Sequence, residues 1–170
     1  VAIASTTRYE WVLTNYGIMD ASAATVTVYP TTIADDVQFI LDDPDAKVVF
    51  VEDAEQLTKI TGLRDQLPKV EHVVLMTGRI PEGTDTSWVL TMLDLRHRGV
   101  LALRENPALV DERVDATTMG HLATLVYTSG TTGRPKGVRL PHRVGVFGAD
   151  TAEATAKSAG GGLLTLDGKQ

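Results

Sequence analysis

The sequence predicts an α/β fold with a largely parallel sheet and helices on both faces of that sheet. Short β-branched runs alternate with amphipathic segments of about 10 to 15 residues, the spacing that is typical of βαβ units. One run, Lys47–Val51 (KVVFV), is apolar at almost every position, as expected for a strand that is covered on both faces. Ligands of such folds bind beyond the carboxyl ends of the strands, so the segments after the strands are where a site is expected.

The chain begins with one strand–helix–strand unit. Val1–Ala4 and Ala24–Tyr29 are the predicted strands. Between them, Thr7 and Glu10 have the Thr-x-x-Glu spacing of a capping box, which predicts that a helix starts there. The apolar stripe that we expect this helix to bury is Val12, Tyr16, Met19 and Ala23.

Two more helices and two more strands follow. Thr32 is the expected N-cap of a helix over Ile33–Asp43, with acidic residues in its first turn, where negative charge is favoured. After the strand Lys47–Val51, a helix is predicted over Glu55–Leu67 and a strand over Val70–Met76.

The second half of the chain is less regular. A fourth helix is predicted over Ser87–Arg98, with Gly99 as its stop. Val100–Arg113 has no clear periodicity, and Leu122–Tyr127 is the last predicted strand.

Composition excludes several classes of function. With 170 residues, 43% of them hydrophobic and 22% charged, the chain has the composition of a globular domain. Its net charge of −6 argues against nucleic acid as a main partner. The absence of cysteine excludes disulfides, thiol nucleophiles and Cys-based zinc sites, and fits a cytoplasmic location. The four histidines lack metal-ligand spacing, so we expect no resident metal centre made from them.

No apolar run reaches the roughly 20 residues that a membrane-spanning helix needs, so no transmembrane segment is expected. A peripheral contact with a membrane and the oligomeric state both stay open.

The segment Leu125–Val138 (LVYTSGTTGRPKGV) is the strongest functional signal. Glycines let its backbone approach a ligand closely, its hydroxyls donate hydrogen bonds, and its lysine carries a positive charge. Together these groups indicate a site for phosphate. The candidate binding residues are Thr128, Ser129, Gly130, Thr131, Thr132, Gly133, Lys136 and Gly137. The spacing of a Walker A loop is not met, because Arg134 and Pro135 separate Gly133 from Lys136 and Gly137 follows the lysine.

The run Tyr127–Val138 closely resembles the phosphate-binding motif of the adenylate-forming superfamily, which includes acyl-CoA synthetases, luciferases and amino-acid adenylation domains. The segment Ala23–Asp53 resembles the long-chain fatty-acid CoA ligase branch of that superfamily. The resemblance covers Val1–His142, so residues 1–142 are expected to be a partial N-terminal AMP-binding domain. We expect residues 143–170, which are rich in alanine and glycine, to form a poorly ordered tail.

The resemblance implies a fragment of an ATP-dependent, AMP-forming ligase that joins a fatty acid to coenzyme A. ATP, Mg²⁺ and coenzyme A would take part, and the Mg²⁺ ligand would come from a downstream part of the enzyme. Thr128 and the residues through Lys136 would hold the β- and γ-phosphates, and His142 falls near a histidine that follows the motif in the family. The fragment is expected to be inactive alone, and no catalytic residue is assigned.

Two other functions stay open. An amino-acid adenylation domain shares the same loop, so the loop cannot distinguish it from a fatty-acid ligase. A non-catalytic nucleotide- or phosphate-binding module would also need these residues. Neither the acid nor its preferred chain length can be deduced from the sequence.

Overall fold

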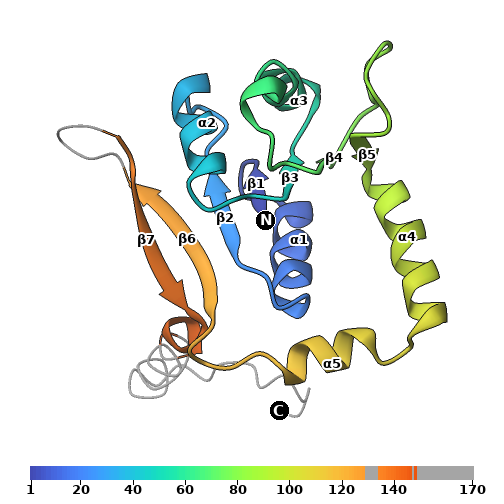
Figure 1. Cartoon of the computed structure of the whole chain (residues 1–170), viewed down its shortest axis with the longest axis vertical. Coiled ribbons are helices and arrows are strands. Elements are labelled where there is room, and N and C mark those ends of the chain that lie inside the picture. The colour runs from blue at the N-terminus through green and yellow to red at the C-terminus, as the bar shows by residue number, and fades with distance from the viewer. Residues whose placement is uncertain (129–133, 147, 149–170) are drawn as a thin grey trace, which may run out of the picture.

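The computed structural model describes residues 1–128, 134–146 and 148, and its strands form a single sheet in the order β5-β4-β3-β1-β2-β6-β7 (Figure 1). Strands β1 to β6 pair in parallel, and β7 pairs antiparallel with β6. The strands are β1 (Ala2–Ala4), β2 (Thr25–Val28), β3 (Val48–Val51), β4 (His72–Leu75), β5 (Val89–Thr91), β6 (Leu122–Thr128) and β7 (Lys136–Pro141). The predicted α/β class with a largely parallel sheet is therefore confirmed.

Helices connect these strands. They are α1 (Tyr9–Asp20), α2 (Ala34–Asp42), α3 (Ala54–Thr61), α4 (Met92–Glu105) and α5 (Leu109–Asp115), with a 3₁₀ helix, η1 (Arg64–Gln66), after α3. Residues 142–146 continue from β7 as a helical segment. Most of the expected tail, residue 147 and residues 149–170, lies outside the described part of the chain.

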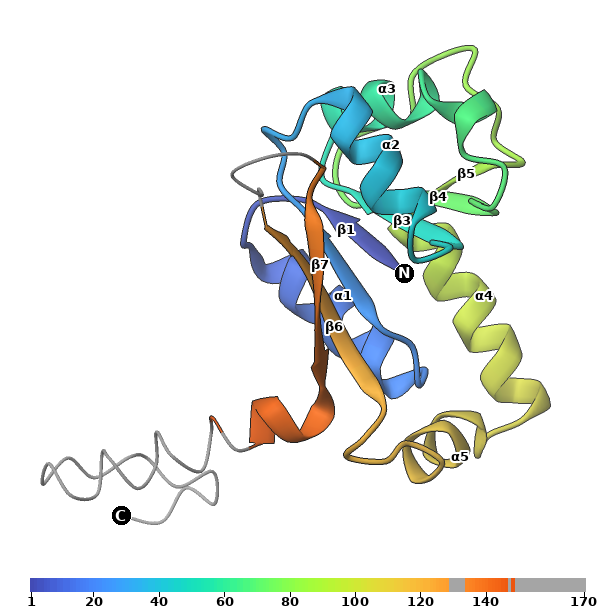
Figure 2. The same ribbon diagram turned by 60° about the vertical axis from the view of Figure 1, so that its left-hand side comes forward.

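The alternation of side chains along the strands builds a core on each face of the sheet. Ala2 and Ala4 belong to a cluster that includes residues of α2 and α3, such as Leu41 and Leu57. Ile3, which points to the opposite face, packs in a second cluster with residues of α1 and α4. Figure 2 shows α1 and α2 on opposite sides of the strands. The prediction of helices on both faces is therefore confirmed.

Helix α1 buries a different side from the one predicted. Val12 and Tyr16 are 41% and 62% exposed, whereas Thr14 and Ile18 are buried against the sheet. The predicted capping box is also absent: the N-cap is Arg8, and Glu10 pairs with the Arg8 guanidinium instead. Apolar residues surround this helix almost evenly, so periodicity alone did not give the buried direction.

The caps of α2 and α3 also differ from those predicted. Ile33, not Thr32, is the N-cap of α2, and it makes no side-chain capping bond. Helix α3 starts after Asp53, whose carboxylate accepts hydrogen bonds of 3.0 Å from the N–H groups of Glu55 and Gln56. This helix ends at Thr61, and the remainder of the predicted helix contains the short 3₁₀ helix η1.

The segment predicted as one helix over Ser87–Arg98 is a strand followed by a helix. Val89 and Leu90 are buried in β5, which pairs with β4. Thr91 and Asp94 then form a reciprocal capping box that starts α4. That helix continues through Gly99, so the predicted stop at this glycine is wrong.

Helices α4 and α5 carry the chain from β5, at one edge of the sheet, back to β6 near the other edge (Figure 1). Neither helix has a buried residue, and Leu93, Leu101 and Val114 are about half exposed. None of the described helices is long and apolar enough to cross a membrane.

Candidate functional site

The candidate site lies at the open end of the β6–β7 hairpin. Thr128 is the last residue of β6, and Lys136 and Gly137 are the first residues of β7. The antiparallel register pairs Thr128 with Lys136, and Tyr127 with Gly137. A hydroxyl and an ammonium group therefore stand on facing positions, both on exposed residues. The other predicted binding residues, Ser129, Gly130, Thr131, Thr132 and Gly133, lie outside the described residues.

The strand β7 was not predicted, and it changes how Lys136 is held. The sequence suggested that Lys136 and Gly137 close a loop, whereas both are paired with β6. The candidate groups are still the Thr128 hydroxyl and the Lys136 ammonium group. The lysine, however, belongs to a strand that is hydrogen-bonded to the sheet. Because β6 runs parallel to β2, Thr128 lies at the carboxyl edge, where ligands of α/β folds bind.

His142 does not lie at this end of the hairpin. Strand β7 separates it from Lys136, and its backbone N–H donates to the carbonyl of His121, before the start of β6. His142 is therefore not part of the open end of the hairpin, where Thr128 and Lys136 lie.

Tyr127 fixes β6 to α2. It is 8% exposed, and its hydroxyl donates a 2.5 Å hydrogen bond to Oδ2 of Asp43, directly after α2. Its ring meets the Phe39 ring edge-on, with centroids 6.2 Å apart at 86°. Burial, followed by the bond to the Asp43 carboxylate, raises the pKa of Tyr127 well above its ordinary value, so the hydroxyl keeps its proton and remains a donor.

Gly137 leaves room for the Tyr127 ring. A Cβ atom at this glycine would lie 3.1 Å from Cζ and 3.2 Å from Cε1 of that ring. Both distances are closer than ordinary carbon–carbon contacts, so a larger residue would push the strand and the ring apart.

We expect Gly137→Ala to lower the free energy of unfolding by about 1–3 kcal/mol, because the added methyl group overpacks against Tyr127. Urea unfolding followed by circular dichroism measures the change. The matched control is Gly99→Ala in α4, where an added Cβ has no neighbour within 4 Å and the variant should be stabilised by up to about 1 kcal/mol. Equal destabilisation by the two variants would contradict this role of Gly137.

A second polar cluster ties the loops after β1 and β3 at the same edge of the sheet. Oε2 of Glu52 accepts hydrogen bonds from Thr6 N at 2.7 Å, Thr6 Oγ1 at 2.8 Å and Ser5 Oγ at 3.2 Å. Its other oxygen is 3.2 Å from the Arg8 guanidinium. Glu52 thus occupies hydrogen-bond donors at the carboxyl ends of β1 and β3. These two neighbouring strands lie where the strand order changes direction, which is the usual place for a ligand in such a sheet.

The pKa of Glu52 lies below its ordinary 4.5, chiefly because the Thr6 backbone N–H donates to the carboxylate, an effect that burial partly offsets. A depressed pKa adds stability that is present above the unfolded-state pKa and lost as the pH falls through the folded-state value. We therefore expect Glu52→Gln to be less stable than the unmodified chain near neutral pH. This difference should shrink as the pH falls below 4.5.

Chemical denaturation at a series of pH values measures this difference. Glu55→Gln is the matched control, because the same charge is removed from an exposed residue of the next helix. A difference between Glu52→Gln and the unmodified chain that stays constant down to acid pH would contradict the proposed coupling.

A cleft of about 430 Å³ lies between the carboxyl ends of β1 and β2, next to the strand that leads to Thr128. Its wall includes the hydroxyl residues Ser5, Thr6 and Thr31 and the aromatic rings of Trp11 and Tyr29. Hydroxyls and rings suit a ligand that is both polar and flat.

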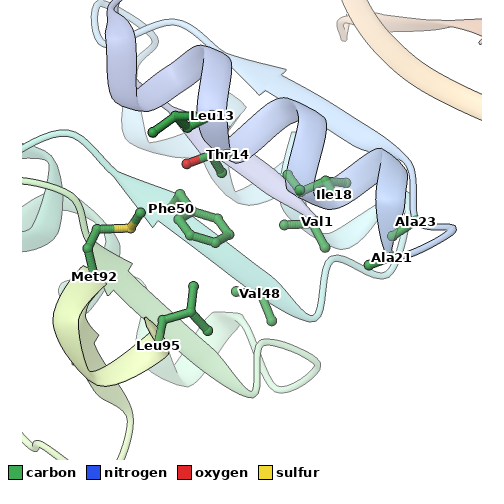
Figure 3. A pocket seen from close by; sticks show the side chains of 11 residues that line it. Val1, Leu13, Thr14, Ile18, Ala21, Ala23, Val48, Phe50, Met92 and Leu95 are labelled. Carbon is green, nitrogen blue, oxygen red and sulfur yellow. The ribbon is translucent and has the colours of Figure 1, made fainter. Parts of the chain in front are cut away.

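An apolar cavity of about 340 Å³ lies between α1 and α4, as Figure 3 shows. Val1 and Val48, at the amino ends of β1 and β3, contribute to it together with Phe50, Leu95 and Met92. The cavity therefore lies over the face of the sheet that α1 and α4 cover, and Thr128 is not among its lining residues. Thr14 Oγ1 lies among these side chains without a hydrogen-bond partner in the described residues.

The described residues offer no ready-made centre of several metal ligands. No group of three or more His, Asp or Glu side chains in this part of the chain could hold a metal ion. Asp43, the carboxylate in contact with the hairpin, is already bonded to Tyr127. Phosphate is a better fit, since the hairpin end offers a hydroxyl and a cation that makes no ion pair with the described residues.

Comparison with known proteins identifies a family. The model of the "AMP-binding enzyme" family matches residues 1–162. A long-chain-fatty-acid–CoA ligase, FadD15 of Mycobacterium bovis, is 36% identical over 140 residues, which are 82% of this chain and 22% of the relative. The human long-chain-fatty-acid–CoA ligase ACSBG1 is 33% identical over 140 residues, 82% of this chain and 19% of the relative. The chain thus spans about a fifth of the length of these relatives.

Solved structures show the same fold. The anthranilate CoA ligase AuaEII, in complex with anthranoyl-AMP, superposes with a TM-score of 0.66 at 23% identity over 88% of this chain and 26% of its own. The luciferase-like enzyme from the Zophobas morio mealworm gives a TM-score of 0.61 at 18% identity over 89% of this chain and 32% of its own. At these identities the likeness is one of fold.

Proposed function

Because the chain belongs to the AMP-binding enzyme family, we propose that it is the portion of an ATP-dependent acid–CoA ligase that binds the departing pyrophosphate. The observation that carries this proposal is the facing pair of Thr128 and Lys136 at the carboxyl edge of the sheet. The intervening residues Ser129 to Gly133 are the further donors that we assign to this role from the sequence.

The chemistry explains why such a pair is useful. In the first step, a carboxylate oxygen attacks the α-phosphorus of ATP, and the bond to the bridging oxygen of pyrophosphate breaks. Negative charge accumulates on the leaving pyrophosphate, so fixed donors and a cation beside it lower the barrier. The Thr128 hydroxyl donates a hydrogen bond, and the Lys136 ammonium offsets the charge. In the second step, the coenzyme A thiol displaces AMP from the acyl-adenylate.

A long-chain fatty acid is the proposed acid, because both reported relatives above 30% identity are named as ligases for such acids. We assign the protein ligands of the Mg²⁺ that accompanies ATP to a downstream part of the enzyme, since the described residues hold no group of three or more metal-ligating side chains. We place the reaction in the cytoplasm, which fits the absence of cysteine.

A chimaera tests this function in the setting of a whole enzyme. Residues 1–142 would replace the matching segment of the Mycobacterium bovis FadD15, and acyl-adenylate formation would be measured by hydroxamate trapping with palmitate and with the twenty amino acids. We expect trapping with palmitate alone. Trapping with an amino acid would favour an adenylation domain.

The same chimaera with Lys136→Ala is the control for the phosphate contact, and its thermal stability shows whether it is folded. If the chimaera without this substitution is folded but inactive, and the isolated chain binds pyrophosphate, a non-catalytic phosphate-binding module would be favoured instead.

A further inference from the structure

The carboxyl end of α2 contacts strand β6 and Arg134, which lies just before strand β7. From β6, Tyr127 reaches Asp43, which lies 84 positions earlier in the chain, and its ring meets Phe39. From the β7 side, the Arg134 guanidinium carbon lies 5.4 Å from the centroid of the Phe39 ring, within the range of a cation–π contact. One helix end therefore contacts a residue on each side of the segment 129–133.

Asp43 is set apart from the other carboxylates near it. Asp42 and Asp45 both pair with Lys69, at 3.5 and 2.5 Å. In the described residues, Asp43 makes its side-chain hydrogen bond with Tyr127. Its position directly after the helix turns the carboxylate toward β6 instead of the lysine.

The register of the hairpin transmits this contact to the phosphate-facing residues. Tyr127 is opposite Gly137, and the next pair is Thr128 with Lys136. Because Gly137 has no side chain, the Tyr127 ring lies directly against the backbone of β7. A displacement of Tyr127 would therefore move the strand that carries Lys136.

We propose that Phe39 and Asp43 are positioning residues that hold Thr128 and Lys136 at the spacing needed for a diphosphate. This inference rests on the proposed function for the ligand, but the anchoring itself can be measured without any ligand. In this proposal neither side chain contacts the ligand. Asp43 acts through Tyr127, and Phe39 acts through Tyr127 and Arg134.

Hydrogen exchange of the 170-residue chain, followed by mass spectrometry, tests the anchoring. Tyr127→Phe keeps the ring and removes the hydroxyl, and Asp43→Ala removes the acceptor. Both should raise exchange rates in peptides covering Leu122–Thr128 and Lys136–Pro141 by about tenfold, because the partly buried, charge-assisted hydrogen bond between Tyr127 and Asp43 is lost. Peptides from β1 and β3 should not change. Asp43→Asn, which keeps an acceptor oxygen, should restore most of the protection.

The matched control is Asp42→Ala, which removes the same charge from the neighbouring position and, among the described residues, breaks the ion pair with Lys69. Its hairpin peptides should exchange as in the unmodified chain. Unchanged hairpin exchange in both Tyr127→Phe and Asp43→Ala would overturn the inference.

Calorimetry with pyrophosphate separates this inference from the proposed function. If the unmodified chain binds pyrophosphate, Tyr127→Phe should weaken binding by about fivefold, and an unchanged affinity would overturn the positioning role. If the unmodified chain does not bind pyrophosphate, the proposed function fails, and the exchange data alone decide whether α2 anchors the hairpin.

Discussion

Replacing Lys136 by alanine is expected to weaken pyrophosphate binding to this chain by about tenfold or more. The loss of one hydrogen bond to a charged group reduces the binding free energy by about 1.5–3 kcal/mol, and about 1.4 kcal/mol corresponds to a factor of ten in affinity. Lys136 is exposed at the first position of β7, so its removal should leave the core unchanged. Isothermal calorimetry at low and at high salt measures the loss, which should be smaller at high salt because exposed charges are screened.

Arg139→Ala is the matched control for Lys136. Arg139 is an exposed cation in the same strand, but its register partner is Leu125, further from the open end of the hairpin. This variant should lose much less affinity. Equal losses of affinity in the two variants would show that pyrophosphate binding depends on the total positive charge of β7 and not on a specific contact with Lys136.

Trp88→Ala is expected to destabilise the fold by about 3–5 kcal/mol, the range for truncating a large core side chain. Trp88 is 7% exposed and packs in the cluster that includes residues of α2 and α3. Its indole N–H donates a 2.9 Å bond to the carbonyl of Val70, and the Arg64 guanidinium carbon lies 4.8 Å from its ring. Truncation would leave a cavity and a buried carbonyl without its partner.

Trp88→Phe separates these two effects. It keeps an aromatic ring in the core and removes the N–H donor, so we expect a loss of about 1–3 kcal/mol. Urea unfolding of the unmodified chain and both variants gives the three free energies. A loss below about 1 kcal/mol for Trp88→Ala would contradict a core role for this side chain.

Strong local signals in the sequence predicted the strands of the sheet centre correctly. Val48–Val51 is apolar on both faces because it lies between two neighbouring strands and beneath helices on each side. The continuous run of apolar residues was therefore sufficient to predict this strand. The same holds for β2, whose predicted range of Ala24–Tyr29 contains Thr25–Val28.

Tertiary contacts decided the elements that were predicted wrongly. Val89 and Leu90 are in a strand because they pair with β4, and no helical periodicity distinguishes such a short run beforehand. The reciprocal pair of Thr91 and Asp94 was a visible sign of where the helix begins. Strand β7 was missed because its first residues, Lys136 and Gly137, belong to a motif that suggested only a loop.

For the candidate site, the sequence suggested which residues would contact phosphate but not which contacts support them. Thr128 and Lys136 were chosen from their chemistry and spacing, and the register places them opposite each other. The contacts of Tyr127 with Asp43 and Phe39 join positions more than 80 residues apart, and no local pattern predicts such pairs. Tyr127 lies within the motif, and a buried tyrosine hydroxyl usually has a hydrogen-bond partner. Its position in the sequence could therefore have indicated that such a partner exists, but not which residue it is.

A titration of the ¹⁵N-labelled chain with pyrophosphate, followed by NMR, tests most directly whether the end of the β6–β7 hairpin binds a diphosphate. We expect saturable shifts of the amide signals of Thr128, Lys136 and Gly137, little change in β1 and β3, and loss of the response in Lys136→Ala. Saturable shifts confined to other parts of the sheet, or no shift at the hairpin at millimolar pyrophosphate, would show that the phosphate site is not there.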